Sequence, residues 1–378
     1  MSRNAAVEVD LSAVRSNART LAALAPDAVL CAVVKADGYG HGAVEVARAA
    51  LEGGAACLAV AVVEEGRALR DHGIDAPIML LSEPPPEAMA DAHAAGLTPI
   101  VYTAAGIDAA AAAARGAAAP WEVHLKVDTG MHRAGADPCD AVALARRIVE
   151  HPSLRLGGTA THLAAADEPD HHVTADQLGR FREVLADLSR AGIDPGVRHA
   201  ANSAGLLAHP DAHFDLVRVG IALYGLAPSP ALEGAAPLQP AMTVRACVSL
   251  VRDVDKGEGV SYGLRHVFDE PAQVAVVPLG YADGVPRRLG TAGGSVLIGG
   301  VRRPIRGVVT MDQLMVEVTD GPVVEAGDEV VLLGRQGDEQ ITAQEWADLL
   351  DTISYEVVCG FGPRMPRVHL DRAPGRPG

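Results

Sequence analysis

The feature that most constrains the fold is a regular alternation of short apolar segments with amphipathic ones. Helical patterns such as GAVEVARAALEG (42–53) and TADQLGRFREVLADLSRAG (174–192) lie between most of the apolar segments. Strands that alternate with helices are typical of βαβ units around a parallel sheet. Eight of them predict an α/β fold with a closed (β/α)8 barrel of the TIM type. The strand candidates are 28–35, 57–62, 77–81, 98–101, 121–128, 154–162, 197–202 and 215–220.

The pattern changes after a segment rich in Pro, Ala and Gly at 228–240. From 241 onward, strand signals dominate between Gly- and Asp-rich turns, and only TAQEWADLLDT (342–352) has a helical pattern. We therefore expect a barrel over 1–240 and a mostly β domain over 241–378. The strand-like opening segment 5–10, which precedes a helical pattern at 11–25, is a candidate to pack with the second domain.

Composition narrows the class of protein. The chain has 49% hydrophobic and 21% charged residues and a formal net charge of −16. The composition is that of a globular protein, and the acidic balance argues against nucleic acid or an anionic membrane as the main partner. The N-terminus has no apolar region of signal-peptide length, and no apolar run is long enough to span a bilayer. Five scattered cysteines without a C-x-x-C pair indicate reduced core thiols. We expect a cytoplasmic protein.

Lysine is unusually scarce. Of 32 basic residues, 29 are arginine, and the three lysines are Lys35, Lys126 and Lys256. Lysine can lose its proton and form an imine, whereas arginine can do neither. The surviving lysines are therefore candidates for chemical roles. Lys256 lies in a turn-like DKGEG segment, and the simplest explanation for this lysine is that it was retained by chance.

Lys35 follows an apolar strand and precedes ADGYGHG. A charge at the end of a buried barrel strand points to the functional face. Three interpretations compete at this stage. One is a loosely fitting dinucleotide fingerprint from Gly38 to Ala43, followed by Glu64. The others are a lysine that binds a cofactor covalently, and a Gly-rich loop with no chemical role.

Histidine pairs give no metal site. His209 and His213 have i, i+4 spacing, but Pro210 follows the first and no Glu lies nearby. The adjacent His171 and His172 follow an acidic loop and are expected to be solvated. We expect no metal ion.

AVVKADGYGHG resembles the cofactor-lysine motif of alanine racemases, which are pyridoxal-phosphate enzymes built from a barrel and a β domain. The resemblance covers almost the whole chain, in order. Its further blocks are KVDTGMHRAG (126–135), ATHLAAAD (160–167), ANSAG (201–205), VRVGIALYG (217–225), VSYG (260–263), GYADG (280–284), TMDQLMV (310–316) and ISYEVVCGFGPRMPRV (353–368).

The resemblance implies pyridoxal 5'-phosphate as the cofactor and Lys35 as the residue that binds it and acts as a base on one face of the substrate Cα. Tyr262 would be the acid/base on the opposite face, supplied by a second subunit of a homodimer. His162 and Arg218 would support this tyrosine, and Arg218 would also face the pyridine nitrogen. The cofactor-binding residues implied are Lys35, Tyr39, Ser203, Arg218, Gly220, Ile221 and Tyr355.

The remaining site residues also follow from the resemblance. Arg133, Tyr281 and Met311 would bind the substrate, with Asp312 nearby. Lys126 would be carbamylated and would orient Arg133. A bare ammonium beside Arg133 would place two like charges in a partly desolvated site, which is costly. A lysine paired with Asp128 is the simpler alternative.

The implied function is a pyridoxal-phosphate-dependent alanine racemase, an isomerase that interconverts L- and D-alanine and supplies D-alanine for peptidoglycan synthesis. A related racemase with broader or serine preference is the alternative, because Thr310 stands where a cysteine is common in the family. A barrel-type decarboxylase of basic amino acids would leave Tyr262 without a role. A pyridoxal-phosphate-binding protein made of the barrel alone would lack the second domain.

Overall fold

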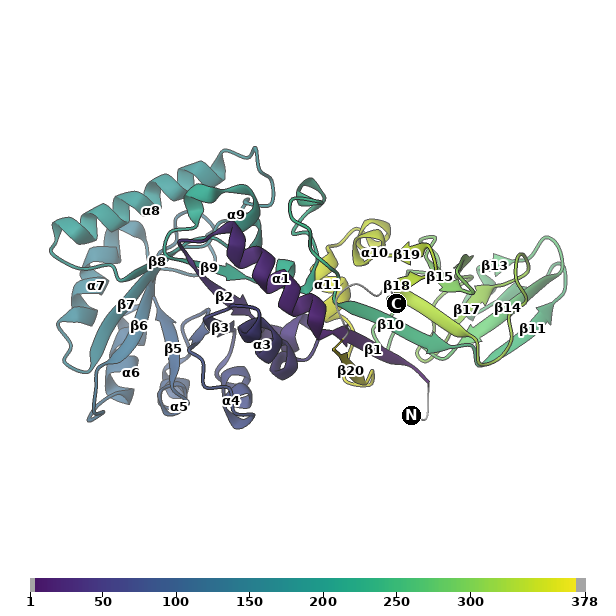
Figure 1. Ribbon diagram of the computed structural model, residues 1–378, viewed down its shortest axis with the longest axis horizontal. Helices are drawn as coiled ribbons and strands as arrows, with labels where there is room; N and C mark the ends of the chain where they lie inside the picture. Colours follow the sequence, from purple (N-terminus) through teal and green to yellow (C-terminus); the bar gives the residue numbers. More distant parts are fainter. Residues whose placement is uncertain (1–3, 372–378) are drawn as a thin grey trace. The chain divides into compact units, whose positions relative to one another are not determined.

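The computed structural model describes residues 4–371, and the chain divides into two compact units (Figure 1). One unit contains residues 13–39 and 43–239. Within the described residues, the other contains 4–12, 40–42 and 240–371. Three separate stretches of sequence therefore contribute to the second unit.

The first unit is built on one parallel sheet of eight strands in the order β8-β7-β6-β5-β4-β3-β2-β9. The gap between β8 and β9 is bridged by main-chain hydrogen bonds, from Asp215 N to Arg198 O and from Arg218 N to Ala201 O, each 3.0 Å. The predicted barrel is thereby confirmed. The strands are β2 (Val29–Val33), β3 (Cys57–Val60), β4 (Ile78–Leu80), β5 (Leu97–Val101), β6 (Trp121–Lys126), β7 (Leu154–Ala160), β8 (Val197–His199) and β9 (Leu216–Val219).

Helices connect these strands, and Figure 1 shows α4 to α8 around their outside. Local capping sets where some of them begin. The Thr103 hydroxyl accepts the Gly106 N–H at the start of α6, and the Asn202 side chain accepts the Gly205 N–H at the start of α9. The helices are α1 (Leu11–Leu24), α3 (Ala43–Glu52), α4 (Val63–Asp71), α5 (Met89–Ala94), α6 (Ala104–Ala113), α7 (Ala141–Val149), α8 (Val173–Arg190) and α9 (Ser203–Ala208).

The second unit is mostly β, as predicted. Its main sheet has the order β16-β15-β18-β10-β1-β20, with β19 paired to β18, and β11-β14-β17 form a separate sheet. Its strands are β1 (Ala6–Asp10), β10 (Met242–Cys247), β11 (Leu250–Val254), β12 (Gly259–Val260), β13 (His266–Val267), β14 (Ala272–Val277), β15 (Ser295–Ile298), β16 (Val301–Pro304), β17 (Leu314–Glu317), β18 (Glu329–Gln336), β19 (Glu339–Ile341) and β20 (Arg367–Leu370).

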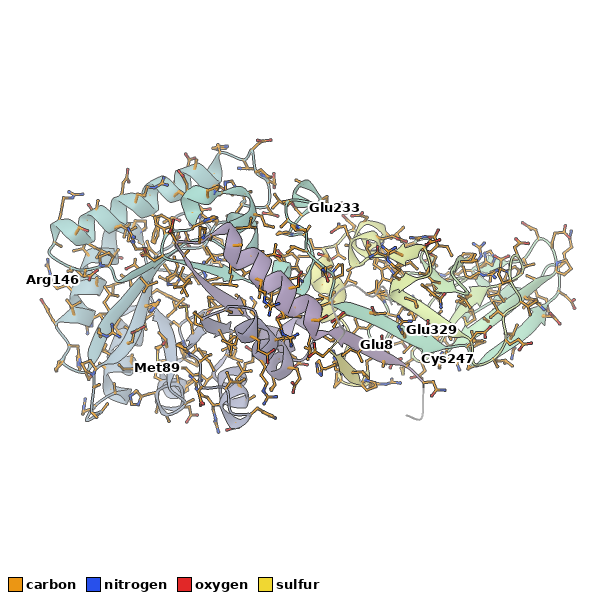
Figure 2. The ribbon with its side chains drawn as sticks, viewed as in Figure 1. Glu8, Met89, Arg146, Glu233, Cys247 and Glu329 are labelled. Carbon is orange, nitrogen blue, oxygen red and sulfur yellow. The ribbon has the colours of Figure 1, made fainter. Side chains whose placement is uncertain are left out.

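The N-terminal strand β1 lies inside this main sheet. It pairs antiparallel with β10 and parallel with β20, and Val7 and Val9 are fully buried. Arg245 of β10 pairs with Glu8 of β1 (3.1 Å) and with Glu329 of β18 (2.6 Å), two carboxylates that Figure 2 labels. The opening segment of the chain is therefore integral to a sheet formed by its last third.

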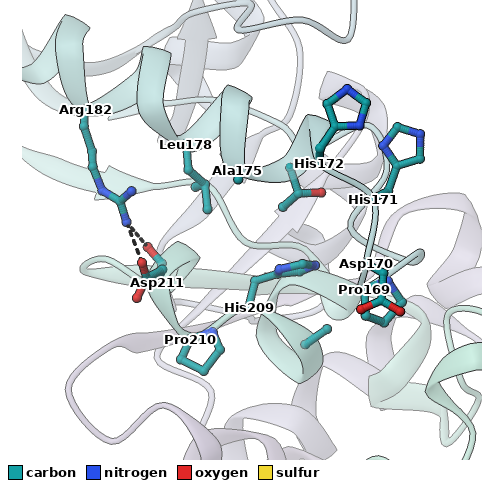
Figure 3. A pocket seen from close by; sticks show the side chains of 12 residues that line it. Pro169, Asp170, His171, His172, Ala175, Leu178, Arg182, His209, Pro210 and Asp211 are labelled. Carbon is teal, nitrogen blue, oxygen red and sulfur yellow. Dashed lines mark hydrogen bonds and ion pairs between the residues drawn. The ribbon is translucent and has the colours of Figure 1, made fainter.

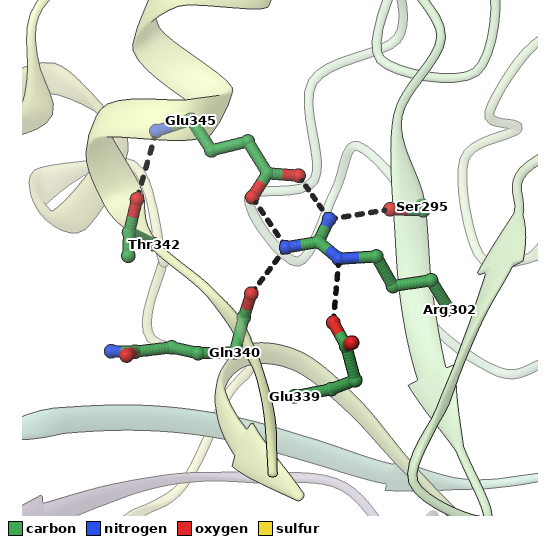
Figure 4. A network of polar contacts seen from close by, with 6 residues as sticks. All are labelled: Ser295, Arg302, Glu339, Gln340, Thr342 and Glu345. Carbon is green, nitrogen blue, oxygen red and sulfur yellow. Dashed lines mark hydrogen bonds and ion pairs between the residues drawn. The ribbon is translucent and has the colours of Figure 1, made fainter.

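A surface network joins three other elements of this unit (Figure 4). Arg302 of β16 donates to Glu339 of β19 and, through two N–H groups, to Glu345 of α10 (Ala343–Leu350). These contacts, with that to Glu345 the strongest, raise the pKa of Arg302. The bidentate geometry holds the helix against the strands.

The sequence expectations for this unit were incomplete in two places. A second helix, α11 (Ser354–Cys359), follows α10, although only 342–352 had a helical pattern. Its six residues include two valines, and such a short β-branched segment has no helical periodicity to detect. The single apolar run over 242–254 forms two strands, β10 and β11, that belong to different sheets. Among residues 4–371, no helix combines the length and the apolarity needed to cross a bilayer.

Candidate active site

Cationic side chains gather at the carboxyl ends of the barrel strands. Lys35 follows β2, Lys126 ends β6, and Arg218 lies in β9. His162 follows β7, and burial, together with the charges of all three of these cations, lowers its pKa. The carboxyl ends of strands form the functional face of this type of barrel. A site with this balance of charge suits an anionic ligand.

Lys35 opens a turn with unusual backbone geometry, the element α2 (Lys35–Tyr39). Ala36, Asp37, Gly38 and Tyr39 all have φ between 51° and 61°. This left-handed conformation costs roughly 1–2 kcal/mol for each residue that is not glycine. Such strain persists only where surrounding contacts enforce it, and it concentrates at functional sites.

Two carboxylates hold this left-handed turn. Glu65 accepts the N–H of Ala36 (2.6 Å) with one oxygen and the N–H of Ala61 (2.8 Å) with the other. The Asp37 side chain accepts the N–H of Ala43, the first residue of α3 (2.9 Å). Because these bonds fix the backbone on both sides of the turn, they fix the direction in which Lys35 leaves β2.

Arg218 is the most connected buried cation of the site, with 5% of its surface exposed. Its guanidinium donates to His199 Nδ1 (2.8 Å), to His162 Nδ1 (3.2 Å) and to the carbonyl oxygens of Thr161 and Ala200. Burial lowers the pKa of Arg218 to about 10, which leaves it protonated at neutral pH. A guanidinium held by so many acceptors has a fixed orientation.

The same contacts set the state of both histidines. Arginine only donates hydrogen bonds, so Nδ1 of each ring must accept and Nε2 must carry the hydrogen. Burial and the neighbouring Arg218 hold the pKa of His162 and of His199 well below the usual value. Both rings are therefore neutral at pH 7, and each offers an N–H donor on the side away from Arg218.

Lys126 is buried among like charges. Only 7% of its surface is exposed, and burial, together with Arg218 and Arg133, lowers its pKa to about 8. Asp128 opposes this shift, but less than Arg218 and Arg133 promote it. One Asp128 oxygen accepts the N–H groups of Gly130 and Met131. Arg133 is exposed within this chain. The cations around Lys126 would therefore stabilise a negative charge added to this residue.

A second group of predicted residues forms a small cradle after β8 and β9. The Ser203 hydroxyl lies at the start of α9 and accepts the N–H of Gly220 (3.0 Å) and of Ala222 (3.3 Å). A Cβ at Gly220 would clash with the Tyr39 hydroxyl, so only glycine fits there. Ile221 begins the next 3-10 turn (Ile221–Tyr224). A hydroxyl, a phenol and main-chain N–H groups at strand ends are suitable donors for a phosphate.

The remaining predicted residues belong to the second unit, and their position relative to Lys35 stays a prediction. Tyr262, Tyr281 and Met311 expose 72%, 42% and 52% of their surfaces within this chain. Asp312 pairs with Arg364 (2.7 Å). Tyr355 lies in α11 and is partly buried.

The backbone around Tyr262 is also strained. Ser261 before it and Leu264 after it have φ of 64° and 45°, and the Ser261 hydroxyl donates to Val308 O (2.6 Å). Strained residues of this kind mark positions where geometry is set by function rather than by local preference.

Sequence reasoning missed two residues that support the site: Glu65, which holds the turn after Lys35, and His199, which contacts Arg218. Glu65 gave no signal, because its role depends on a backbone conformation that the sequence did not predict. His199 lies in the strand-like VRHAAN and is fully buried. Its position in a strand that precedes ANSAG was the only available signal.

Three of the four histidines for which the sequence predicts no metal site line a hollow of about 440 Å³ beside α8 (Figure 3). His171, His172 and His209 contribute to it, and Arg182 at its edge donates to Asp211. None of the residues predicted for catalysis or cofactor binding lines this hollow. Within residues 4–371, no group of His, Cys, Asp or Glu side chains is arranged to hold a metal ion.

A parallel barrel with a lysine after its first strand, a phosphate cradle after its last, and a separate β domain define the barrel class of pyridoxal-phosphate enzymes. The residues fit that cofactor, because the Ser203 hydroxyl, the Tyr39 phenol and the main chain at Gly220 meet after β9, and the surrounding cations favour an anion. Sequence profiles of the alanine racemase N-terminal and C-terminal domains match residues 9–228 and 241–369. The chain belongs to the alanine racemase family.

Individual relatives agree over nearly the whole length. An alanine racemase of Symbiobacterium thermophilum is 49% identical over 96% of both chains. The crystal structure of alanine racemase from Streptomyces lavendulae superimposes with a TM-score of 0.92 at 42% identity and covers 98% of both chains. That from E. faecalis gives 0.93 at 37% identity, covering 98% of this chain and 99% of its own. The cofactor and the isomerase class expected from the sequence are thereby confirmed.

Proposed function

We propose that this chain racemises alanine with two bases, Lys35 on one face of Cα and Tyr262 on the other. The observation that carries the proposal is the held geometry around Lys35. The left-handed turn fixes the backbone of this residue, and Arg218 and His162 occupy fixed positions at the same end of the barrel. Removing a proton from one face and returning one to the other requires two groups that do not move with the substrate.

Pyridoxal phosphate, when bound, draws electron density from Cα into its ring and so acidifies the Cα proton. Ser203, Tyr39 and the main chain at Gly220 and Ile221 would hold the phosphate. Arg218 would face the pyridine nitrogen. Because Arg218 stays protonated and can only donate, it leaves that nitrogen without a full positive charge. This limits how far the negative charge spreads from Cα and favours return of the proton there.

Tyr262 needs a donor that stabilises its phenolate, since a tyrosine hydroxyl is a weak base at neutral pH. Neutral His162 is suited to this role, because Arg218 fixes its Nε2–H as the free donor. The high exposure of Tyr262, Tyr281 and Met311 within one chain supports a homodimer in which each β domain completes the partner's site.

The substrate is expected to be alanine, and the product D-alanine would supply peptidoglycan synthesis in the cytoplasm. Arg133 would bind the substrate carboxylate, together with Tyr281 and the main chain of Met311. Asp312 is held by Arg364 and would shape the entrance.

The deciding experiment is chiral analysis of L-alanine after incubation with the purified holoprotein, with L-serine measured in parallel. We expect both alanine enantiomers and much slower turnover of serine. Comparable rates for the two would favour the broader racemase instead. Tyr262→Phe should abolish racemisation and leave cofactor absorption unchanged, whereas Tyr102→Phe, a matched change outside the proposed site, should remain active. An active Tyr262→Phe variant would contradict the two-base assignment.

Subunit mixing tests the shared site. Inactive Lys35→Ala and inactive Tyr262→Phe chains, mixed and allowed to exchange, should recover up to about a quarter of the activity, because random pairing gives about half heterodimers with one intact site each. No recovery after verified exchange would place both bases in one chain.

A further inference from the structure

A column of polar side chains runs through the barrel away from the proposed site. Arg218 donates to His199 Nδ1 at 2.8 Å, and His199 Nε2 lies 2.9 Å from His124 Nδ1. His124 Nε2 lies 3.4 Å from a Glu122 oxygen. His199 and His124 are 0% and 3% exposed, whereas the Glu122 side chain reaches the surface. The column therefore links a buried cation to a carboxylate at the barrel exterior.

All hydrogen bonds in the column point the same way. Arg218 can only donate, so His199 accepts at Nδ1 and donates through Nε2. His124 then accepts at Nδ1, and its Nε2–H faces Glu122. Each acceptor is polarised by the next, and the chain ends on a negative charge, so the bonds strengthen one another. The anion at Glu122 thereby makes His199 a stronger acceptor for Arg218.

Two glycines of β7 make room for this column. A Cβ at Gly158 would lie 2.7 Å from the His124 ring, and a Cβ at Gly157 would clash with the Glu122 side chain. Arg155, also of β7, pairs with Glu122 and anchors the outer end. The His124 contact and the Arg155 pairing lower the pKa of Glu122, which keeps it ionised at neutral pH. The room left by the two glycines, the charge on Glu122 and the common direction of the hydrogen bonds therefore all indicate that the column is a specific structure and not incidental packing.

We propose that Glu122 and His124 are positioning residues that act through His199 to fix the orientation and donor strength of Arg218 toward the pyridine nitrogen. This inference rests on the proposed function for Arg218. Glu122 and His124 reach Arg218 only through His199 and are not among the residues proposed to bind the substrate or the cofactor, so the column should affect the chemical step more than alanine binding.

Glu122→Gln keeps the size and an acceptor but removes the charge, and it lies at the surface end, where folding is least affected. We expect kcat for alanine to fall about threefold to tenfold with KM within about twofold, and the visible absorption band of the bound cofactor to shift. His124→Phe should lower kcat about tenfold or more. His124→Asn, whose amide oxygen can replace Nδ1 as the acceptor, should restore part of that loss.

The apoprotein gives a readout that does not depend on activity. ¹⁵N NMR of histidine-labelled protein should show protonated Nε2 and unprotonated Nδ1 in His199 and His124, and Glu122→Gln should shift both. Asp108→Asn is the matched control, because it removes another surface carboxylate paired with an arginine, Arg147, outside the column.

The proposal is overturned if Glu122→Gln changes the imidazole shifts, the cofactor band and kcat no more than Asp108→Asn does. It is also overturned if the two rings carry their hydrogens on Nδ1. A wild-type protein that failed to racemise alanine would refute the proposed function instead, since the column in the apoprotein would still be observed.

Discussion

Lys126 allows a prediction whose size follows from the structure. Its pKa falls from 10.5 to about 8, so its ammonium form is disfavoured in the folded protein. At ~1.4 kcal/mol per unit, this corresponds to ~3.5 kcal/mol of folding free energy, an upper figure for a group with some access to water. Between pH 8 and 10.5 the unfolded chain binds more protons than the folded one. In buffer free of CO₂, the free energy of unfolding contributed by Lys126 should therefore rise with pH through this window, and the full penalty should apply below pH 8.

Carbamylation would remove this penalty. The neutral amine is the form that reacts with CO₂, and at pH 8 about half of Lys126 is neutral. The carbamate is an anion among cations and can pair with Arg133. Added bicarbonate should therefore raise the unfolding midpoint near pH 8 and flatten its pH dependence. Lys126→Met should raise the unfolding midpoint and flatten its pH dependence without bicarbonate, and its free energy of unfolding should increase by about 1–3 kcal/mol at pH 7. This variant should nevertheless lose activity, because nothing then orients Arg133.

Denaturant titrations of the apoprotein with and without bicarbonate measure the effect, and ¹³C NMR with labelled bicarbonate detects the carbamate directly. Lys256→Met is the control, because Lys256 is 64% exposed and pairs with Glu270 at the surface. A carbamate signal that survives in Lys126→Met, or equal bicarbonate responses of wild type and Lys126→Met, would refute the reasoning. A crystal structure with an ammonium and no anion at Lys126 would also do so.

Three further predictions concern the cofactor and its support. Borohydride reduction of the holoprotein followed by peptide mapping should place the cofactor's mass on Lys35, and a label on Lys126 or Lys256 would contradict the assignment. Gly220→Ala should weaken cofactor binding about tenfold or more by forcing the Tyr39 hydroxyl away, as measured by absorbance titration; unchanged affinity would argue against the cradle. Glu65→Gln should destabilise the barrel by about 1–2 kcal/mol and lower kcat, because the Ala36 and Ala61 N–H groups lose a charged acceptor; a denaturant titration and an assay that both match wild type would show that the left-handed turn holds without the carboxylate.

The sequence predicted the barrel well because short strand-like segments alternate regularly with helical patterns, and strands such as β3 (CLAV) and β4 (IML) are wholly apolar, as strands buried on both faces are. It did not predict the turn after Lys35. Gly38 suggested a tight turn, but Ala36, Asp37 and Tyr39 also have positive φ, and these residue types do not prefer it. That conformation depends on Glu65, which lies 30 residues beyond Lys35 in the sequence.

The sequence also did not predict the column of polar side chains through the barrel. His124 and His199 lie 75 residues apart and meet only when β6, β7 and β8 assemble. The sequence around a single buried histidine in a strand does not show which residue it contacts, so its role could be recognised only in the three-dimensional structure. The residues that the family resemblance identified are those proposed to carry the chemistry, and the residues that the structure added contact them or the turn beside Lys35.

The position of β1 has a consequence for synthesis on the ribosome. This strand emerges before its two neighbours, which are β10, beginning at Met242, and β20, ending at Leu370. At about 5–20 residues per second, it waits on the order of tens of seconds for both. During that time the side chains of Val7 and Val9 and two unpaired edges are open to other chains. Slowed translation or a shortage of chaperones should therefore reduce the yield of this protein through the exposure of β1. A copy of the chain that begins after β1 should aggregate even though its barrel strands are intact.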